Sequence, residues 1–452
     1  MTPSNPSLSA AFARDLFALH AALDDSAIIK ARECLLDFLG VAVAGAHDRR
    51  ASHGAILNRL GSGGTAATVL GLDARANLLT AGLLNGMSAH HFELDDGHRY
   101  GMVHPGATVI AALLPLAETR DVDDAGLLRA IVVGYEAAIR LAMAVQPGMK
   151  HRGYHATGTC GAIGAAMGAG VLLGQDPTQL HTTLCLAATQ AAGLLQVIRE
   201  GSDLKPFNAG QAALHGLLAA TMGSVGFTGP RDVLGDAQGL LNVLSDTPQA
   251  DRLADVGREA PAIHGIYVKP YAACRHCHPA IEAALALRNR ERLDIAEVDS
   301  VQVHTYGLAV HLHDHRRVQT SADARMSTPY SVAAALRFGS ADMAQFSPKA
   351  MTDPELQRVL EAVEVVEDPT LSANVPRERA ARVTISLRNG DHSQHTVTLP
   401  KGEPENPLAP DERLDKFRSL VAHAGLPPER ATEIIGCVSG ERPGIAALYA
   451  TL

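Results

Sequence analysis

Residues 161–174 read GAIGAAMGAGVLLG, an uncharged run of small and aliphatic side chains. Glycines recur in it at positions 161, 164, 168 and 170, among alanines. Because glycine lets two backbones approach closely, this spacing favours a buried helix packed tightly against its neighbours. The run is not a Gly-x-Gly-x-x-Gly fingerprint, and no predicted strand precedes it, so we exclude a dinucleotide site. It is also short for a membrane span.

The composition of the whole chain agrees with closely packed helices. Of the 452 residues, 46% are hydrophobic and 19% are charged, which is a globular profile. Aromatic residues make up only 4% and tryptophan is absent, so the core must be built from small and aliphatic side chains. The length predicts two domains rather than one.

Charge and targeting signals exclude several classes of protein. The net charge of −9 and the lack of a Lys/Arg run argue against nucleic-acid binding. The first 25 residues lack a basic leader and an uninterrupted apolar stretch, so we expect no secretory signal. The six cysteines are scattered rather than framed for disulfides. We therefore expect a cytoplasmic protein with reduced thiols that does not bind membranes.

The hydrophobic pattern predicts a mainly α fold with three segments. Residues 1–266 are expected to form the first part of a large all-helical domain, in which Asp176-Pro177 opens one helix. Residues 267–402 are expected to form a smaller α+β domain. In it Val301, Val303 and Thr305 alternate as in a strand, and Asn389-Gly390 predicts a hairpin turn. Residues 403–452 are expected to be helical again and to rejoin the first domain.

A basic side chain stands at the start of four predicted apolar helices. A helix N-terminus offers unpaired N–H groups and a partial positive charge, so it favours anions. Three His and one Lys at such ends are what a site for a small polycarboxylate needs. The four segments are His104-Pro105-Gly106, His155-Ala156-Thr157-Gly158, Lys205-Pro206-Phe207 and His278-Pro279-Ala280.

The densest polar cluster is HHFELDDGH, residues 90–98, which contains Glu93, Asp95, Asp96 and His98. It has neither zincin nor EF-hand spacing, so we predict no metal. Carboxylates beside imidazoles can instead orient a His and shift its pKa for proton transfer. A solvated loop remains the alternative for this cluster taken alone.

Three further features have competing explanations. Residues 274–278, CRHCH, match the C-x-x-C-H haem attachment motif, but we expect no export signal, and no second Cys/His pair completes a zinc knuckle. A reactive thiol at Cys274 or Cys277 is the alternative explanation of this motif. His311, His313 and His315 alternate as in a strand, and we interpret them as a solvated face. Tyr330 is either a core residue or a site residue.

Six segments resemble the 2-methylcitrate dehydratase (MmgE/PrpD) family, which includes cis-aconitate decarboxylase and iminodisuccinate epimerase. They lie in family order along nearly the whole chain. The segments are HFELDDGHRYGMVHPGATVIAALLPLAE, GYHATGTCGAIGAA, LKPFNAGQAALHGLLAA, VKPYAACRHCHPAIEA, STPYSVAAALRFG and GEPENPLAPDERLDKF.

The resemblance implies a large all-helical domain, a smaller α+β lid domain and a homodimer without metal or organic cofactor. It places five residues in the active-site cleft, namely Asp96, His104, His155, Lys205 and His278. We add five predicted substrate contacts, namely Glu93, Asp95, His98, Arg275 and Tyr330. We predict His104 and His155 as the proton-transfer pair with His155 as the base, and Lys205 and His278 as carboxylate clamps.

The acidic loop departs from the family pattern Asp-Phe-Asp-Asp-Thr. Glu93 stands for the first Asp, Gly97 stands for the Thr, and one extra residue precedes His104. Family membership therefore does not settle the substrate or the reaction, and 2-methylcitrate is only an example of the expected substrate class. The leading hypothesis is a cofactor-independent dehydratase of a hydroxylated di- or tricarboxylate. The alternatives are an epimerase of a dicarboxylate, a cis-aconitate-type decarboxylase and, in another class, a non-catalytic or haem-type binder.

Overall fold

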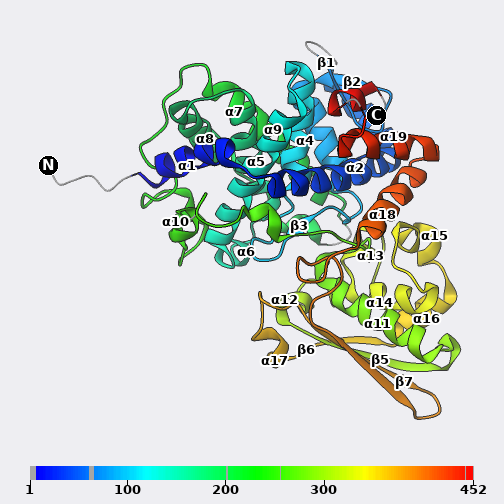
Figure 1. Cartoon of the computed structure of the whole chain (residues 1–452). Coiled ribbons are helices and arrows are strands. Elements are labelled where there is room, and N and C mark those ends of the chain that lie inside the picture. Colours follow the sequence, from blue (N-terminus) through cyan, green and yellow to red (C-terminus); the bar gives the residue numbers. More distant parts are fainter. Residues whose placement is uncertain (1–6, 61–65, 200–201, 255, 443, 451–452) are drawn as a thin grey trace.

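The computed structural model describes residues 7–60, 66–199, 202–254, 256–442 and 444–450. The fold is mainly α, as the sequence predicts. Figure 1 shows helices gathered at one end of the molecule and a small sheet with its covering helices at the other. The helical part also contains the C-terminal helices, in red.

Helix α7 (Ala156–Leu172) lies at the centre of the helical part and is buried from Ala156 to Val171. A side chain added at Gly164 would come within 2.6 Å of the Gly134 carbonyl oxygen. The predicted close packing of the glycine run is thus confirmed, because only glycine leaves room for the neighbouring backbone. The helices packed against α7 are α4 (Gly106–Arg120), α5 (Asp124–Val145), α8 (Pro177–Gln190) and α9 (Lys205–Gly223).

The other elements of the helical part surround this centre. The Asp176 carboxylate accepts hydrogen bonds from the backbone of Thr178 and Gln179, so the predicted cap of α8 is confirmed. The remaining helices are α1 (Leu8–Ala22), α2 (Asp25–Leu60), α3 (Leu78–Ala89), α6 (Gly148–His151) and α10 (Leu240–Leu244). Two short antiparallel pairs join β1 (Ala66–Thr68) to β2 (Arg75–Asn77) and β3 (Gly97–His98) to β4 (Ile266–Tyr267).

The predicted strands form a four-stranded sheet in the order β6-β5-β7-β8. Val301, Val303 and Thr305 are buried, which confirms the alternation read from the sequence. Gly390 has φ 91° in the turn between β7 and β8, a conformation that suits glycine. The strands are β5 (Val298–Thr305), β6 (Val363–Glu367), β7 (Ala381–Leu387) and β8 (His392–Val397), of which only β6 runs parallel to β5.

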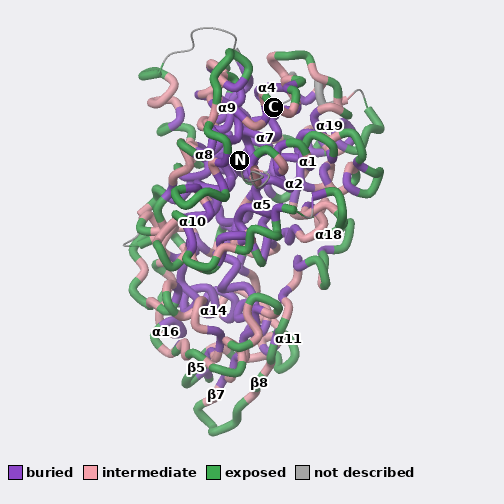
Figure 2. Tube along the Cα trace, turned by 90° about the vertical axis from the view of Figure 1, so that its left-hand side faces the viewer, coloured by how far each residue is buried: buried purple, intermediate pink, exposed green. Residues whose placement is uncertain are grey.

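Helices α11, α14 and α16 accompany the sheet, and α11 and α14 contact its strands. Their bounds and those of the short neighbours are α11 (His278–Glu291), α12 (Gly307–Val310), α13 (Ser321–Met326), α14 (Thr328–Phe338), α15 (Pro348–Met351), α16 (Pro354–Glu361) and α17 (Pro369–Ser372). The apolar core is continuous from the helical part into the sheet part, and Figure 2 shows buried residues reaching α14. Because the core is continuous, the structure does not divide the chain into a helical domain and a separate lid domain. The lid domain and the predicted domain boundaries remain proposals.

The chain returns to the helical part at its C-terminal end through α18 (Pro410–His423) and α19 (Pro428–Ser439). Phe417 and Leu420 of α18 fill the space left by Gly40 of α2, and Lys416 bonds Asp37. Helix α18 therefore packs against α2, near the other end of the chain. Within the described residues, no helix is long and apolar enough to cross a membrane.

Candidate active site

The four predicted helix starts are all present, and three of them meet at one cavity. His104 lies two residues before α4, His155 caps α7, and Lys205 is the first residue of α9. These three side chains line a narrow cavity of about 70 Å³ between the helical part and the sheet part. The fourth residue, His278, begins α11 but does not line this cavity.

Cationic side chains are prominent in the lining of the cavity. Its cationic lining residues are Lys150, Lys205, Arg275 and Arg379. No Asp or Glu is among the described residues that line it, although carboxylates lie directly behind. Four imidazoles, of His104, His155, His276 and His313, also face it. Such a lining favours a small ligand with more than one negative charge.

The His104 ring is held by a backbone group. Its Nδ1 lies 2.6 Å from the main-chain oxygen of Asp96. Because a carbonyl only accepts, Nδ1 must carry the proton, which leaves the lone pair on Nε2 in the neutral ring. Burial and the charge of Lys269 lower the pKa of His104 to about 3, so the ring is neutral at pH 7. A neutral imidazole with a free lone pair can act as a general base.

The His155 ring has the opposite tautomer. Asn208 Nδ2 also donates to the Leu194 carbonyl, so it is the amide nitrogen that lies 3.1 Å from His155 Nδ1. His155 Nδ1 therefore accepts, and Nε2 carries the proton. Burial and the charge of Lys205 hold the pKa of His155 well below its ordinary value. The two neutral histidines thus offer one acceptor and one donor.

Lys205 is paired with the acidic loop. Its Nζ lies 2.6 Å from both carboxylate oxygens of Glu93, and Lys269 Nζ lies 3.6 Å from one of them. Burial alone would raise the pKa of Glu93, but the charges of Lys205 and Lys269 hold it below its ordinary value. Glu93 therefore neutralises the charges of these two lysines and does not itself line the cavity.

Asp95 bonds a third imidazole, that of His90, which lies near the rings of both His104 and His155. Its Oδ2 lies 2.6 Å from Nδ1 of His90, whose ring centroid is 5.0 Å from that of His104 and 5.9 Å from that of His155. Burial would raise the pKa of Asp95, but His90 and His104 hold it well below its ordinary value. Asp95 Oδ1, His90 Nε2 and Lys269 Nζ are buried without a hydrogen-bond partner in the described part of the chain.

The atoms of His90, Asp95 and His104 lie close enough to bind a metal ion. Three contacts compete with that use. His90 Nδ1 is bonded to Asp95, His104 Nδ1 is bonded to a carbonyl, and Lys269 Nζ stands 3.5 Å from Asp95 Oδ1. An ammonium group at that distance repels a divalent cation. These groups fit proton transfer better than metal binding.

Asp96 turns away from the cavity. One carboxylate oxygen accepts from the backbone N–H of Gly106 at 3.0 Å, and the other accepts from the Tyr135 hydroxyl at 2.6 Å. Burial raises the pKa of Asp96 to about 7. Its carboxylate caps the start of α4, and its main-chain oxygen orients His104. Asp96 is thus placed to position His104 rather than to touch a ligand.

Of the other predicted contacts, Arg275 lines the cavity, and His98, His278 and Tyr330 do not. His98 Nδ1 accepts from the Gly101 backbone, and the Tyr330 hydroxyl donates to the Gln345 carbonyl. His278 lies behind Arg275, with its Nδ1 3.0 Å from the guanidinium. Arg275 is also held by the Glu403 carboxylate at 2.9 Å.

Gly97 is explained by its neighbour across the β3–β4 pair. A side chain at this position would come within 2.4 Å of the Tyr267 hydroxyl. Tyr267 lines the cavity, and the Arg275 guanidinium stacks over its ring at 4.7 Å. The Tyr267 hydroxyl therefore occupies the space that a threonine at position 97 would use. Burial raises the pKa of Tyr267 above its ordinary value, so the hydroxyl keeps its proton.

Several cavity residues were missed from the sequence. The interpretation of residues 311–315 as a solvated strand face is wrong for His313, which follows the short helix α12 and is buried in the cavity wall. Lys150 and Arg379 carry no local signal in the sequence. Lys269 precedes a proline, as Lys205 does, so the same pattern could have indicated it. The cysteines of CRHCH are free thiols, and Cys274 lines the cavity.

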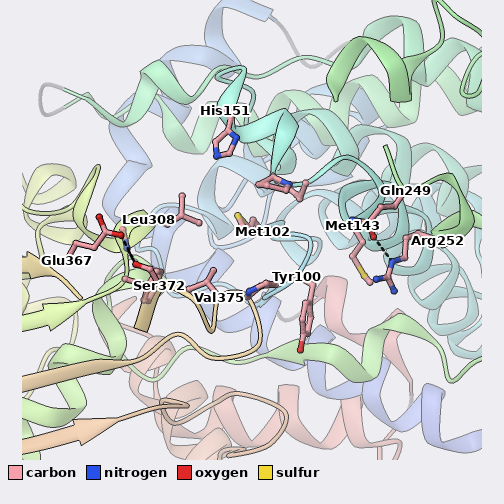
Figure 3. Close-up of a pocket in the computed structure, with 15 residues that line it drawn as sticks. Tyr100, Met102, Met143, His151, Gln249, Arg252, Leu308, Glu367, Ser372 and Val375 are labelled. Carbon is pink, nitrogen blue, oxygen red and sulfur yellow. Dashed lines mark hydrogen bonds between the residues drawn. The ribbon is translucent and has the colours of Figure 1, made fainter. Parts of the chain in front are cut away.

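A larger pocket adjoins the site. It has a volume of about 460 Å³ and shares Met102 and Gln146 with the candidate site. Figure 3 shows Arg252 of the helical part on one side and Leu308 of the sheet part on the other. The pocket has fewer titratable groups than the narrow cavity, so its larger volume does not make it the better candidate for the reaction site. It lies at the junction of the two parts.

The fold and the site define the class of protein. It is a helical protein with a cation-lined, histidine-rich cavity where the helices meet a small sheet. Residues 15–253 match the MmgE/PrpD N-terminal domain, and residues 271–439 match the MmgE/PrpD C-terminal domain. The chain belongs to the MmgE/PrpD family, which confirms the resemblance seen in its motifs.

Relatives in this family are named as decarboxylases. The chain is 27% identical over 379 residues to the cis-aconitate decarboxylase-like protein oryM of Aspergillus oryzae, covering 78% of each chain. It is 26% identical to cis-aconitate decarboxylase of Aspergillus terreus, covering 79% of this chain and 77% of that one. It is 24% identical to cis-aconitate decarboxylase of Homo sapiens, covering 91% of this chain and 87% of that one.

Proposed function

We propose that this protein is a cofactor-independent lyase that acts on a small di- or tricarboxylate by forming a carbanion beside a carboxylate. The observation that carries the proposal is the lining of the cavity, which has four cations and, among the residues that the structure describes, no carboxylate. A carbanion of this kind needs preorganised positive charge, because its own charge spreads onto the carboxylate oxygens. Lys205 and Arg275 are placed to hold those oxygens.

The hydrogen bonds support roles for His104 and His155 that are the reverse of those proposed from the sequence. His104 presents an unprotonated Nε2 and is the proposed base for the α-proton. His155 presents a protonated Nε2 and is the proposed donor. The Tyr267 hydroxyl is a second donor at the same cavity. Each ring is fixed by a partner on its other nitrogen, so neither needs to turn before the reaction.

Dehydration of a hydroxylated acid is the leading reaction. After His104 removes the α-proton, the leaving hydroxyl takes a proton from His155 or Tyr267 and departs as water. Decarboxylation of a cis-aconitate-type acid is the second candidate, which the names of the relatives favour. The test is incubation with citrate-, malate- and aspartate-derived acids followed by NMR. Loss of water, loss of CO₂ or inversion at one carbon distinguishes lyase from epimerase chemistry.

Lys150 gives the site a pH dependence. Burial lowers the pKa of Lys150 to about 8, so its charge is present below that pH and is lost as the pH rises through it. We expect KM for the substrate to rise roughly tenfold between about pH 7 and pH 9.5, the size of effect expected when one charge contact is lost. KM measured against pH for the wild type and Lys150→Arg checks this. Arginine stays charged, so an equal rise in both proteins would contradict the assignment.

Chelation tests the absence of a catalytic metal. We expect dialysis against EDTA to leave kcat/KM unchanged, because Lys269 and the existing hydrogen bonds compete with a cation at His90, Asp95 and His104. The measurement is turnover before and after dialysis, with and without added Mg²⁺, Mn²⁺ or Zn²⁺. Loss of activity that one of these ions restores would assign the cluster to metal binding.

A further inference from the structure

A thiol and an imidazole meet in the wall of the same cavity. Cys274 Sγ lies 3.7 Å from Nε2 of His313, and both residues line the cavity. The backbone N–H of Cys274 donates to the Arg325 carbonyl at 2.8 Å, which fixes the cysteine before the turn into α11. Neither the proposed base nor the proposed donor involves this pair.

The His313 ring is oriented to accept the thiol proton. Its Nδ1 lies 2.7 Å from the main-chain oxygen of Met326, so Nδ1 carries the proton and Nε2 holds the lone pair toward Cys274. The ring also stacks on His276, with centroids 5.2 Å apart and an interplanar angle of 30°. A backbone carbonyl here fixes the base, as a third group does in known nucleophile–histidine pairs.

The surrounding charges favour a thiolate. Burial would raise the pKa of the Cys274 thiol, but His313 and Lys205 lower it to about 6. Lys150 also faces this thiol, Arg379 lines the same cavity, and Glu93 is the carboxylate that opposes them. A thiolate, rather than a thiol, is the reactive form of cysteine.

Cys277 is a natural comparison in the same motif. It does not line the cavity, is fully buried, and accepts a hydrogen bond from the Thr328 hydroxyl at 3.5 Å. Burial and the nearby Cys274 raise the pKa of Cys277 above its ordinary value. Two cysteines three residues apart therefore differ in access, in partner and in charge.

We propose that Cys274 and His313 form a nucleophilic pair at which small electrophiles bearing a carboxylate modify the chain covalently. The inference rests on the anion preference of the cavity in the proposed function, but it needs no turnover. An acid with a double bond beside its carboxylate is one such electrophile. Sulfur bonds to the β-carbon, the π electrons move to the α-carbon, and that carbon takes the proton held by His313. A haloacetate is another, in which the carbon–sulfur bond forms as the halide leaves.

The test compares iodoacetate with the neutral iodoacetamide on the native protein, with each alkylated cysteine located by peptide mass spectrometry. We expect Cys274 to react first and to favour iodoacetate by at least about tenfold relative to free cysteine, the effect of one favourable charge contact. The rate should be half-maximal near pH 6, below the pH expected for a free thiol. Cys277 should react only after denaturation.

Matched variants separate the pair from a merely exposed thiol. Cys274→Ser should remove the modification, and Cys277→Ser should leave it unchanged. His313→Asn can still donate to the Met326 carbonyl but lacks the base, so its pH midpoint should move up toward that of free cysteine. The proposal is overturned if Cys274 is unreactive in the native protein, if it prefers iodoacetamide as free cysteine does, or if His313→Asn leaves the midpoint unchanged. None of these readouts depends on lyase activity, so the two proposals can fail separately.

Discussion

Replacing His104 with asparagine is expected to abolish deuterium exchange at the α-carbon of the substrate and to lower kcat by about 10²- to 10⁴-fold, the usual contribution of a general base. His104 lines the cavity, and its unprotonated nitrogen is Nε2, because Nδ1 donates to the main-chain oxygen of Asp96. An asparagine can keep that hydrogen bond but cannot take a proton. The measurement is NMR of substrate incubated with the variant in D₂O.

His155→Asn is the matched control for this result. Its ring presents a protonated Nε2, so its loss should block product formation while exchange continues, since proton removal precedes the step that it serves. If His155→Asn stops exchange and His104→Asn does not, the roles are reversed and the base is the one first proposed from the sequence. If both variants exchange at the wild-type rate, neither histidine is the base.

Lys205→Ala is expected to lower kcat/KM by at least about 10²-fold, the order lost when one charge-stabilising donor is removed. It should also destabilise the fold by about 3–5 kcal/mol, because Glu93 would stay buried without the cation that bonds it at 2.6 Å, while Lys269 lies 3.6 Å away. Steady-state kinetics and urea unfolding measure the two effects separately.

A second variant separates the two roles of this lysine. In Lys205→Ala/Glu93→Gln the buried charge is gone together with its partner, so most of the lost stability should return. The activity should not return, because no ammonium group faces the cavity at this position. Recovery of activity in the double variant would show that Lys205 serves only to neutralise Glu93, and the clamp role would be rejected.

The large features of the fold follow from local patterns in the sequence. The glycine run predicted a close-packed helix, and the structure shows why, since a side chain at Gly164 would meet the Gly134 carbonyl. The alternation around Val301 and the hairpin turn at Gly390 predicted three strands of the sheet, which are β5, β7 and β8. These signals are local because a helix or strand buries one face at a fixed period.

The candidate site was predictable only in part. The helix-start rule singles out His104, His155 and Lys205, which line one cavity, but it does not predict the direction in which a side chain points. Asp96 turns inward to cap α4, and His278 turns inward behind Arg275. Both were predicted as active-site residues, and neither lines the cavity.

The residues that the sequence did not indicate come from distant parts of the chain. Lys150 lies in a four-residue helix, Arg379 just before β7, and His313 after α12. Their meeting depends on how the sheet part packs against the helices, and that packing has no local signature. Within the sheet part itself, the turn before α11 lies beside the segment after α12, so that Cys274 meets His313.

The most direct test of the central claim is NMR of the wild-type protein in D₂O with a panel of small acids that differ in the number of carboxylates. The account predicts that at least one di- or tricarboxylate loses water or CO₂ after EDTA treatment, and that deuterium enters at the carbon beside its carboxylate. It also predicts that the matching monocarboxylates do not react. Turnover of monocarboxylates at the same rate, or turnover of polycarboxylates with no deuterium at that carbon, would contradict it.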